Sequence, residues 1–471
     1  MDEINLNLDK NNKPEDNIPT KTYLSAAMGN MMFSFLTMVI GTRLFDFYEN
    51  EIGLSTAIVT FIFIIYALIS IVINPLIGYF IDKPRKFWRK YGKRFLWIVA
   101  GGILWSLSFI LLFTVPNLDA NKDWILLTTW FLIVICIYSI CYTIYGVSYG
   151  GLIPDKFRSD KQRLRVSSIG LGLSVIGTLL AALIPPMIIE YGNRASFLTM
   201  AIIVSIIGVI IVLTTIPGAR EDQWMIDRIL SIDTRKEAAK FSEMIKIALK
   251  HRNFLAYLCI FTAIQCMVLI MTASIPYLVR FVLNEKAIVE SYILGGFILS
   301  GFLSVPLWLF VAKKLGDFKK VLILGSLVTI LFTIPFLFIN SLLSAIIATA
   351  LLGVGIIGIN IIIFPMFGDV IDEATVKNGT RQESFYVGFR SIFGGVAVII
   401  QAVSFGLIHI YMGFEPGSAT QSSRAILGLL IQVAIIPMII MIIGITLFWK
   451  FYDLTPERKE QIQAKLKELN L

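Results

Sequence analysis

Charged residues are scarce in this sequence. Asp, Glu, Lys and Arg make up 15% of its 471 residues, against about 25% in a soluble globular domain. The two histidines stand far apart, and the four cysteines have neither metal-ligand nor disulfide-framework spacing. No side chains are spaced as a nucleophile with its base. We therefore expect no metal site, no cofactor, no disulfide framework and no enzyme activity.

Apolar residues, by contrast, make up 56% of the chain, and its mean hydropathy is +0.79. They lie in long runs, each near the ~20 residues that cross a bilayer as a helix. The ~10-residue alternating segments of a membrane barrel are absent. Twelve spans are predicted, at residues 23–47, 55–81, 95–115, 125–151, 168–189, 197–216, 254–281, 291–312, 321–340, 343–366, 385–412 and 426–450. This pattern indicates an all-α membrane protein.

Lysine and arginine sort onto one side of these spans. Of the 41 residues, 34 lie in the two termini and in alternate loops. The opposite loops hold only Lys122, Arg194, Lys286 and Arg424. The positive-inside rule then predicts cytoplasmic termini. The expected location is the plasma membrane. Nucleic acid is not an expected partner, because the basic residues are confined to short loops between apolar runs.

The spans divide into two similar halves of six. The expected segments are a disordered cytoplasmic tail (1–21), an N-terminal half (22–216), a cytoplasmic linker with an amphipathic helix (217–252), a C-terminal half (253–451) and a cytoplasmic C-terminal helix (452–471). Thr455 is placed to cap that last helix, whose apolar stripe includes Ile462 and Leu466. The basic turn 78–94 after span two is echoed by the turn 310–320 after span eight. Two pseudo-symmetric halves of six spans are the plan of the major facilitator superfamily, in which substrate binds near the midplane between the halves.

The loop after span ten carries a more specific motif. The run from Gly368 to Ser384, GDVIDEATVKNGTRQES, resembles the same loop of the melibiose-type sugar:cation symporters, the glycoside–pentoside–hexuronide branch of that superfamily. Shorter agreements are Asn74-Pro75-Leu-Ile-Gly78 in span two, Tyr142-Thr143 in span four and Phe451-Tyr-Asp-Leu-Thr455 at the start of the C-terminal tail. The resemblance covers nearly the whole chain and implies a solute transporter.

In that family, charges of the cytoplasmic loops lock the inward side while the outward side is open. The resemblance assigns this gate here to Asp82, Arg163, Asp369, Asp372, Arg381 and Glu383. Ion pairs between two moving halves must break and re-form, so each is expected to be weak. The alternative is that these are ordinary solvated loop charges.

The chain departs from the family inside the membrane. The family's Asp pair in span two is replaced by Ser70 and Asn74, the span-four Asp by Gly146 and the span-eleven Lys by Gly395. A cation that leaves water needs ionised or strongly dipolar oxygen ligands, and a coupled proton needs a titratable group. Coupling to sodium or protons therefore stays open, and uniport or a different coupling site are the alternatives.

Arg390 is the strongest candidate for a substrate contact. It lies nine residues beyond Arg381, so ~13 Å deeper along a helix that rises ~1.5 Å per residue, and it matches a cavity-lining position of the family. Intramembrane arginine is costly, and guanidinium binds oxyanions through paired hydrogen bonds. A structural hydrogen bond or ion pair is the alternative. The other candidate contacts are Ser70, Asn74, Tyr142, Tyr145 and Tyr149.

Several polar or small residues within the spans also have plain structural interpretations. The three tyrosines share a helix face with Tyr138 and could stack on a sugar or simply pack. Asn74 is expected to hydrogen-bond to a neighbouring helix. Arg43 and Asp46 are three apart near the outer end of span one, where a local ion pair is expected. The run Gly353-Val-Gly355-Ile-Ile-Gly358 spells a dinucleotide fingerprint, but it lacks the preceding strand, so close helix packing is favoured.

These observations predict a secondary transporter that moves a small organic solute by alternating access. By family analogy the solute is a sugar or glycoside. One alternative is a carrier of an anionic or amphiphilic, lysolipid-like substrate. Another is a non-transporting membrane sensor or a lipid scramblase on the same fold. The expected partners are the solute, sodium or a proton, and membrane lipid, and the chain is expected to act as a monomer.

Overall fold

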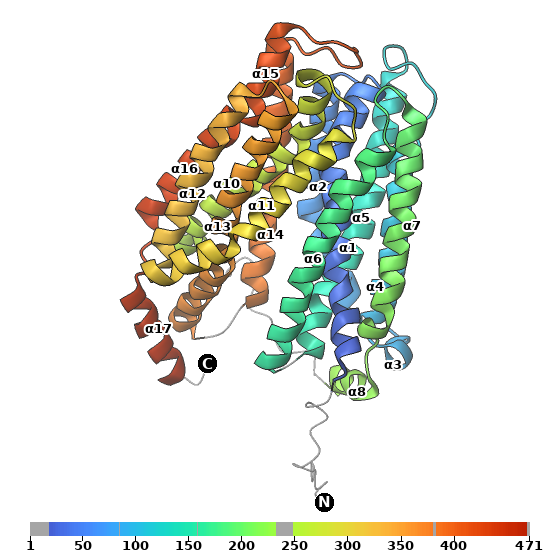
Figure 1. Cartoon of the computed structure of the whole chain (residues 1–471). Coiled ribbons are helices and arrows are strands. Elements are labelled where there is room, and N and C mark those ends of the chain that lie inside the picture. The colour runs from blue at the N-terminus through green and yellow to red at the C-terminus, as the bar shows by residue number, and fades with distance from the viewer. Residues whose placement is uncertain (1–17, 84, 158, 232–247, 380–382, 469–471) are drawn as a thin grey trace, which may run out of the picture.

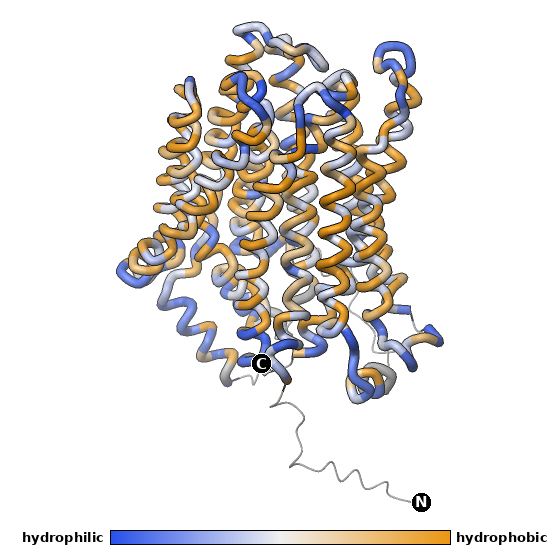
Figure 2. The backbone as a smooth tube through the Cα atoms, turned by 45° about the vertical axis from the view of Figure 1, so that its right-hand side comes forward, coloured by the Kyte–Doolittle hydropathy of each residue, from blue (hydrophilic) through white to orange (hydrophobic). Residues whose placement is uncertain are grey.

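The computed structural model describes residues 18–83, 85–157, 159–231, 248–379 and 383–468. Twelve of its helices are long and apolar enough to cross a membrane, and the described residues contain no strand. Hydrophobic residues fill the middle of the helices, and hydrophilic residues gather at their two ends (Figure 2). The predicted all-α architecture with twelve spans is therefore confirmed.

The N-terminal half occupies the right of Figure 1, coloured blue to green. Its elements are α1 (Thr20–Asp46) with its continuation η2 (Phe47–Glu51), α2 (Thr56–Asp82), α3 (Trp88–Tyr91), α4 (Phe95–Phe113), α5 (Trp124–Lys156), α6 (Asp160–Ile188), α7 (Arg194–Ala219) and α8 (Gln223–Ser231). The long helix α1 packs against both α6 and α7, and α5 packs against α2 and α4.

The C-terminal half occupies the left of Figure 1, coloured yellow-green to red. Its elements are α10 (Arg252–Tyr277) with η3 (Leu278–Val282), α11 (Val289–Leu315), α12 (Phe318–Thr333) with η4 (Ile334–Phe338), α13 (Leu342–Asn378), α14 (Glu383–Met412), α15 (Ser423–Val433), α16 (Ile435–Phe451) and α17 (Pro456–Glu468). The twelfth span consists of α15 and α16. The two halves meet along α2 and α14, α1 and α10, and α6 and α11.

The start of α1 and the helix α17 lie on the same side of the bundle, at the bottom of Figure 1. We call this side the basic side, because the loops rich in lysine and arginine are found there. The other side, where η2 is followed by α2, is called the opposite side.

Three helices extend further toward the basic side than predicted. Helix α5 continues to Lys156, α6 begins at Asp160, and α13 runs to Asn378. At ~1.5 Å per residue α13 is ~55 Å long, well beyond a ~30 Å hydrocarbon core. Intrahelical hydrogen bonds persist in water, so α13 ends only where Gly379 adopts a left-handed conformation, with φ of 69°. Asp369, Asp372 and Arg163 therefore lie on helices, and placing them in loops was wrong.

The segments outside the spans are described in part. Residues 1–17 of the predicted tail and 232–247 of the linker, including most of its predicted helix, lie outside the described residues. A helix, α17, is present where a C-terminal helix was predicted. The backbone N–H of Arg458 donates to Thr455 Oγ1 at 3.4 Å, as expected of a cap, and Ile462 and Leu466 are buried against the C-terminal half.

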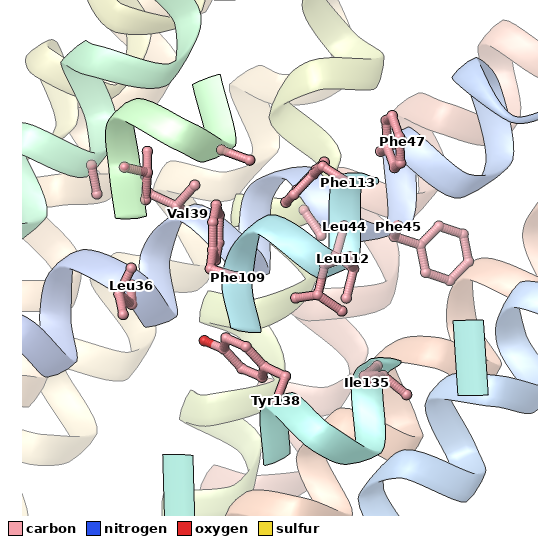
Figure 3. Close-up of a cluster of buried hydrophobic side chains, with 14 of the residues drawn as sticks. Leu36, Val39, Leu44, Phe45, Phe47, Phe109, Leu112, Phe113, Ile135 and Tyr138 are labelled. Carbon is pink, nitrogen blue, oxygen red and sulfur yellow. The ribbon is translucent and has the colours of Figure 1, made fainter. Parts of the chain in front are cut away.

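The helices pack closely against one another in the apolar core. Side chains of α1, α4 and α5 converge in Figure 3, where Val39, Phe109 and Tyr138 are drawn together. Some helices touch through glycine: a Cβ on Gly218 of α7 would lie 2.1 Å from the backbone nitrogen of Ala26 in α1, and a Cβ on Gly353 of α13 would lie 2.2 Å from a carbonyl oxygen of α11. The packing interpretation of the Gly353 run is confirmed.

Candidate functional site

The polar candidates of α2 are bound to α5. Thr143 Oγ1 donates to Asn74 Oδ1 at 2.7 Å, and the hydroxyl oxygens of Ser70 and Ser139 lie 2.9 Å apart. The predicted interhelical hydrogen bond of Asn74 is confirmed. Contact of Ser70 and Asn74 with substrate stays a prediction.

The candidate tyrosines lie on α5 beside Phe33 of α1. The ring centroids of Tyr142, Tyr145 and Tyr149 are 5.8, 5.2 and 5.9 Å from that of Phe33. Tyr145 has no exposed surface, and the Tyr149 hydroxyl donates to the carbonyl oxygen of Ala26 at 2.8 Å. This face therefore packs the N-terminal half. Tyr149 also borders an open cavity between α1, α5 and α6, lined by Asn30, Phe33, Tyr149, Gly150, Ile153, Val166 and Ser167.

Arg390 of α14 lies in an aromatic surround. Its guanidinium carbon is 4.4 Å from the ring centroid of Phe367, 5.2 Å from that of Phe261 and 5.6 Å from that of Phe364. Nη1 donates to the Tyr257 hydroxyl at 3.3 Å. Within the described part of the chain, no carboxylate forms an ion pair with Arg390. Cation–π contacts hold the guanidinium in place while leaving its hydrogen-bonding capacity largely unused.

Arg390 and Asn74 lie at similar depth on facing helices. Thr60 near the start of α2 donates to the carbonyl oxygen of Ala402, and a Cβ on Gly395 would lie 2.9 Å from Ile71. Helices α2 and α14 are thus antiparallel neighbours. About one turn further along both helices from the contact between Ile71 and Gly395, Asn74 lies level with Arg390. The close approach also explains why a long side chain does not fit at Gly395.

The opposite side contains a buried polar network that sequence reasoning missed. We call it the opposite-side network; its members are Arg43, Asp46, Glu49, Asn50, Glu51, Tyr191, Tyr277, Arg280, Glu290 and His409. Two nitrogens of Arg43 bind the two carboxylate oxygens of Glu290 at 2.7 and 2.6 Å, and neither side chain is more than 1% exposed. Tyr191 donates to the same carboxylate at 2.5 Å. The expected local pair between Arg43 and Asp46 was wrong, because the partner of Arg43 is in the other half.

Two further acids of η2 reach across the interface between the halves. Glu49 accepts from the Tyr277 hydroxyl at 2.5 Å and lies 2.9 Å from His409 Nδ1. Glu51 accepts from Arg280 Nη1 at 2.6 Å. Burial raises the pKa of the Tyr191 hydroxyl well above its ordinary value, and the nearby Glu290 raises it further, so this tyrosine stays a donor.

The network had only a faint signal in the sequence. The run Asp46-Phe-Tyr-Glu49-Asn-Glu51 places three acids at the end of span one, on a side otherwise poor in charge. His409 stands alone in apolar surroundings, and Glu290 follows the loop charges Glu285 and Lys286; both lie far along the chain. Arg43 and Glu290 are 247 residues apart, and no sequence pattern pairs two charges at that separation. In the described part of the chain, no group of three or more His, Cys, Asp or Glu side chains is arranged to hold a metal ion.

Three of the predicted cytoplasmic gate residues have described side chains, and each of the three has a partner within its own half. Asp369 pairs with Lys459 of α17 at 2.5 Å, Asp372 accepts from Gln463 at 2.9 Å, and Arg163 donates to the carbonyl oxygen of Phe157 at 2.9 Å. Arg381 and the side chains of Asp82 and Glu383 lie outside the described residues. Between described residues, every side-chain hydrogen bond or ion pair that joins the two halves lies toward the opposite side. A gate at the basic side stays a prediction for another conformation.

Each half is organised internally at the basic side by one acid. Glu373 accepts from Asn253 at 2.7 Å and from Arg458 at 2.8 Å, and His251 Nε2 lies 2.8 Å from it, so α10, α13 and α17 are tied together. Glu221 accepts from the backbone N–H groups of residues 93–95 at 2.6 to 3.1 Å, at the start of α4. These bonds favour movement of each half as a rigid body.

Comparison with known proteins matches residues 25–456 to the family model described as MFS/sugar transport protein. The sodium-dependent lysophosphatidylcholine symporter 1 of Gallus gallus is 21% identical over 84% of this chain and 79% of its own length. The isoprimeverose transporter of Lactiplantibacillus pentosus is 23% identical over 87% and 84%. The lactose permease of Leuconostoc lactis is 24% identical over 95% and 68%.

Proposed function

Since the chain belongs to the MFS/sugar transport protein family, and is a multi-pass membrane transporter, we propose that it moves a sugar or glycoside across the plasma membrane by alternating access. The observation that carries this proposal is the opposite-side network, which holds two six-helix halves together at one end. The Arg43–Glu290 pair is buried, so each charge depends on the other for its compensation while this end is closed. Opening this end requires the pair to separate.

We infer that the basic side is cytoplasmic and that a single chain holds the whole pathway. The 34 of 41 lysine and arginine residues on that side support this orientation. The described state is then closed to the exterior. In the exterior-open state, the acids Asp369 and Asp372 would exchange their contacts with α17 for contacts with the other half.

The solute is proposed to bind where α2 and α14 face each other, at the level of Asn74 and Arg390. Hydroxyl and amide groups on α2 and α5 suit the neutral hydroxyls of a sugar, and aromatic rings suit its apolar faces. Mutual hydrogen bonds such as Thr143 to Asn74 keep these groups positioned without solute.

Transport can be tested with the purified full chain in proteoliposomes. Radiolabelled lactose and isoprimeverose are supplied outside, with the same unlabelled sugar inside, so that exchange needs no ion gradient. Saturable exchange above protein-free liposomes is expected, and Asn74→Leu should weaken it. Asn340→Leu, at an exposed position after η4, is the matched control. Absence of saturable exchange for every neutral sugar tried would contradict the sugar proposal.

A second candidate, an anionic or amphiphilic substrate, is favoured by Arg390. Its guanidinium has no acidic partner among the described residues and is lined by three phenylalanine rings, which suits a phosphate group next to an acyl chain. The same proteoliposomes can be offered fluorescent lysophosphatidylcholine. Movement of that lipid without sugar exchange, abolished by Arg390→Gln, would select this candidate. Movement of bulk phospholipid alone would indicate a scramblase.

A further inference from the structure

The buried charges of the opposite-side network do not balance. Its four acids, each at most 7% exposed, are Asp46, Glu49, Glu51 and Glu290, and its two arginines are Arg43 and Arg280. With all six ionised and His409 neutral, four negative charges face two positive ones. The exposed charges on the connections next to the network include Glu190, Arg194, Glu285, Lys286 and Glu415, and solvent screens them. A buried excess of negative charge is unfavourable, and buried groups relieve it by taking up protons.

Asp46 has a specific place for one proton. Its Oδ1 accepts from Asn50 Nδ2 at 2.8 Å, whereas its Oδ2 is buried without a donor, and Asn50 Oδ1 is buried without a donor as well. A proton on Oδ2 makes the carboxyl a donor beside an empty amide acceptor. A protonated acid and a primary amide then form two hydrogen bonds in place of one. Asp46 is fully buried and lies near Arg280, Glu51 and Glu290.

His409 has a place for the second proton. Its Nδ1 faces Glu49 at 2.9 Å, its Nε2 is buried without a partner, and the residue is fully buried. The ring stacks on Phe414, with centroids 4.4 Å apart, and lies 5.2 Å from the ring of Tyr277. The imidazolium form would turn the Glu49 contact into an ion pair. With protons on both Asp46 and His409, the buried charges balance.

We propose that Asp46 and His409 form the proton-binding site of this transporter, and that protons bind there as the opposite side closes. The inference rests on the proposed alternating access. It places ion coupling away from α2 and α5, where Ser70, Asn74 and Gly146 offer no titratable group. Several elements contribute the charged or titratable side chains that face the site: α1 and η2 (Arg43, Asp46, Glu49, Glu51), the connection before α7 (Tyr191), α10 and η3 (Tyr277, Arg280), α11 (Glu290) and α14 (His409). Helix α2 contributes the Thr56 hydroxyl, which donates to Glu49. Separation of the halves would hydrate the acids. Hydration stabilises their ionised form, so the protons would be released.

The sign of the pH effect follows from this linkage. Protons bind more tightly in the closed state, so low pH favours closure and the open population rises with pH. Each proton changes the open-to-closed ratio by up to tenfold per pH unit, and two protons by up to a hundredfold. Asp46→Asn places a neutral side chain there at every pH. The slope of the logarithm of the open-to-closed ratio against pH should therefore fall by about one. His409→Gln should do the same, and it keeps the test decisive if Asp46→Asn fails to fold.

The ratio can be measured by spin-label distances in the full chain, reconstituted in nanodiscs with its four cysteines replaced. Labels at Asn121→Cys and Ala419→Cys, both exposed on the opposite side, report separation of the halves between pH 5 and 8.5. Glu285→Gln, an exposed acid on that side, is the matched control and should leave the slope unchanged. Arg43→Ala removes the ion pair with Glu290, so this variant is expected to open the opposite side without a change of pH.

Each outcome decides between the two proposals. A pH slope that Asp46→Asn or His409→Gln reduces supports the proton site. A wild-type population that ignores pH while Arg43→Ala opens the opposite side overturns the proton site and leaves alternating access standing. A population that shifts with 100 mM sodium in place of pH also overturns it. If neither pH nor Arg43→Ala separates the halves, alternating access fails, and the proton site fails with it.

Discussion

Removal of Arg43 should release the two halves at the opposite side. In the closed state Glu290 is fully buried and would keep only the Tyr191 hydroxyl as a partner from the other half. Leaving one member of a buried ion pair uncompensated costs about 3–5 kcal/mol. In the open state Glu290 is hydrated and bears no such penalty. The closed-to-open ratio should therefore fall by about two to four powers of ten, at about 1.4 kcal/mol for each tenfold change.

The double variant Arg43→Ala/Glu290→Ala separates this mechanism from loss of packing. With both charges gone, no ion is left buried, so the double variant should close more readily than Arg43→Ala alone. The distance distribution between spin labels at residues 121 and 419 reports both. The free-energy effects of the two single substitutions on the closed-to-open ratio should not be additive. If they are additive, or if the double variant is the most open, the pair does not hold the halves as described.

Three other substitutions test separate parts of the molecule. Arg390→Gln should lower the affinity for an anionic solute at least tenfold and leave exchange of a neutral sugar nearly unchanged, as measured by concentration dependence in proteoliposomes; equal losses for both would make Arg390 structural. Gly218→Ala should destabilise the N-terminal half by about 1–3 kcal/mol through overpacking against Ala26, seen as a lower melting temperature, whereas Gly172→Ala, whose Cβ meets nothing within 4 Å, should not. Glu373→Gln should loosen α17 by about 1 kcal/mol, because the partly exposed Arg458 loses its charged acceptor, and faster proteolysis near residue 456 would report it; unchanged proteolysis would refute this.

Much of the architecture could be read from local patterns. Each span is a run whose apolar length matches the bilayer, and each basic loop marks a side, so twelve spans and two halves need no knowledge of contacts. The cap at Thr455 is likewise local. Boundaries were less certain, because a helix such as α13 continues into water until Gly379 ends it, and composition changes earlier than structure does.

The candidate site divides in the same way. The interhelical bond of Asn74 was predictable, because a lone amide in an apolar span needs a partner. The partners of Arg43 and His409 were not, because Glu290 and Glu49 are brought to them by helices far apart in the sequence. The nearest acid to Arg43 along the helix is Asp46, and proximity in sequence suggested the wrong pair.

By itself, the sequence determined how many times the chain crosses the membrane, which side holds its basic loops, and which family scaffold it has. These properties depend on transfer of each segment from water to lipid, which is a sum over neighbouring residues. Only the tertiary structure decided which charges meet. The excess of four buried acids over two arginines arises where α1, η2, η3 and α11 converge, because the energy of a buried charge depends on everything around it and not on its place in the chain.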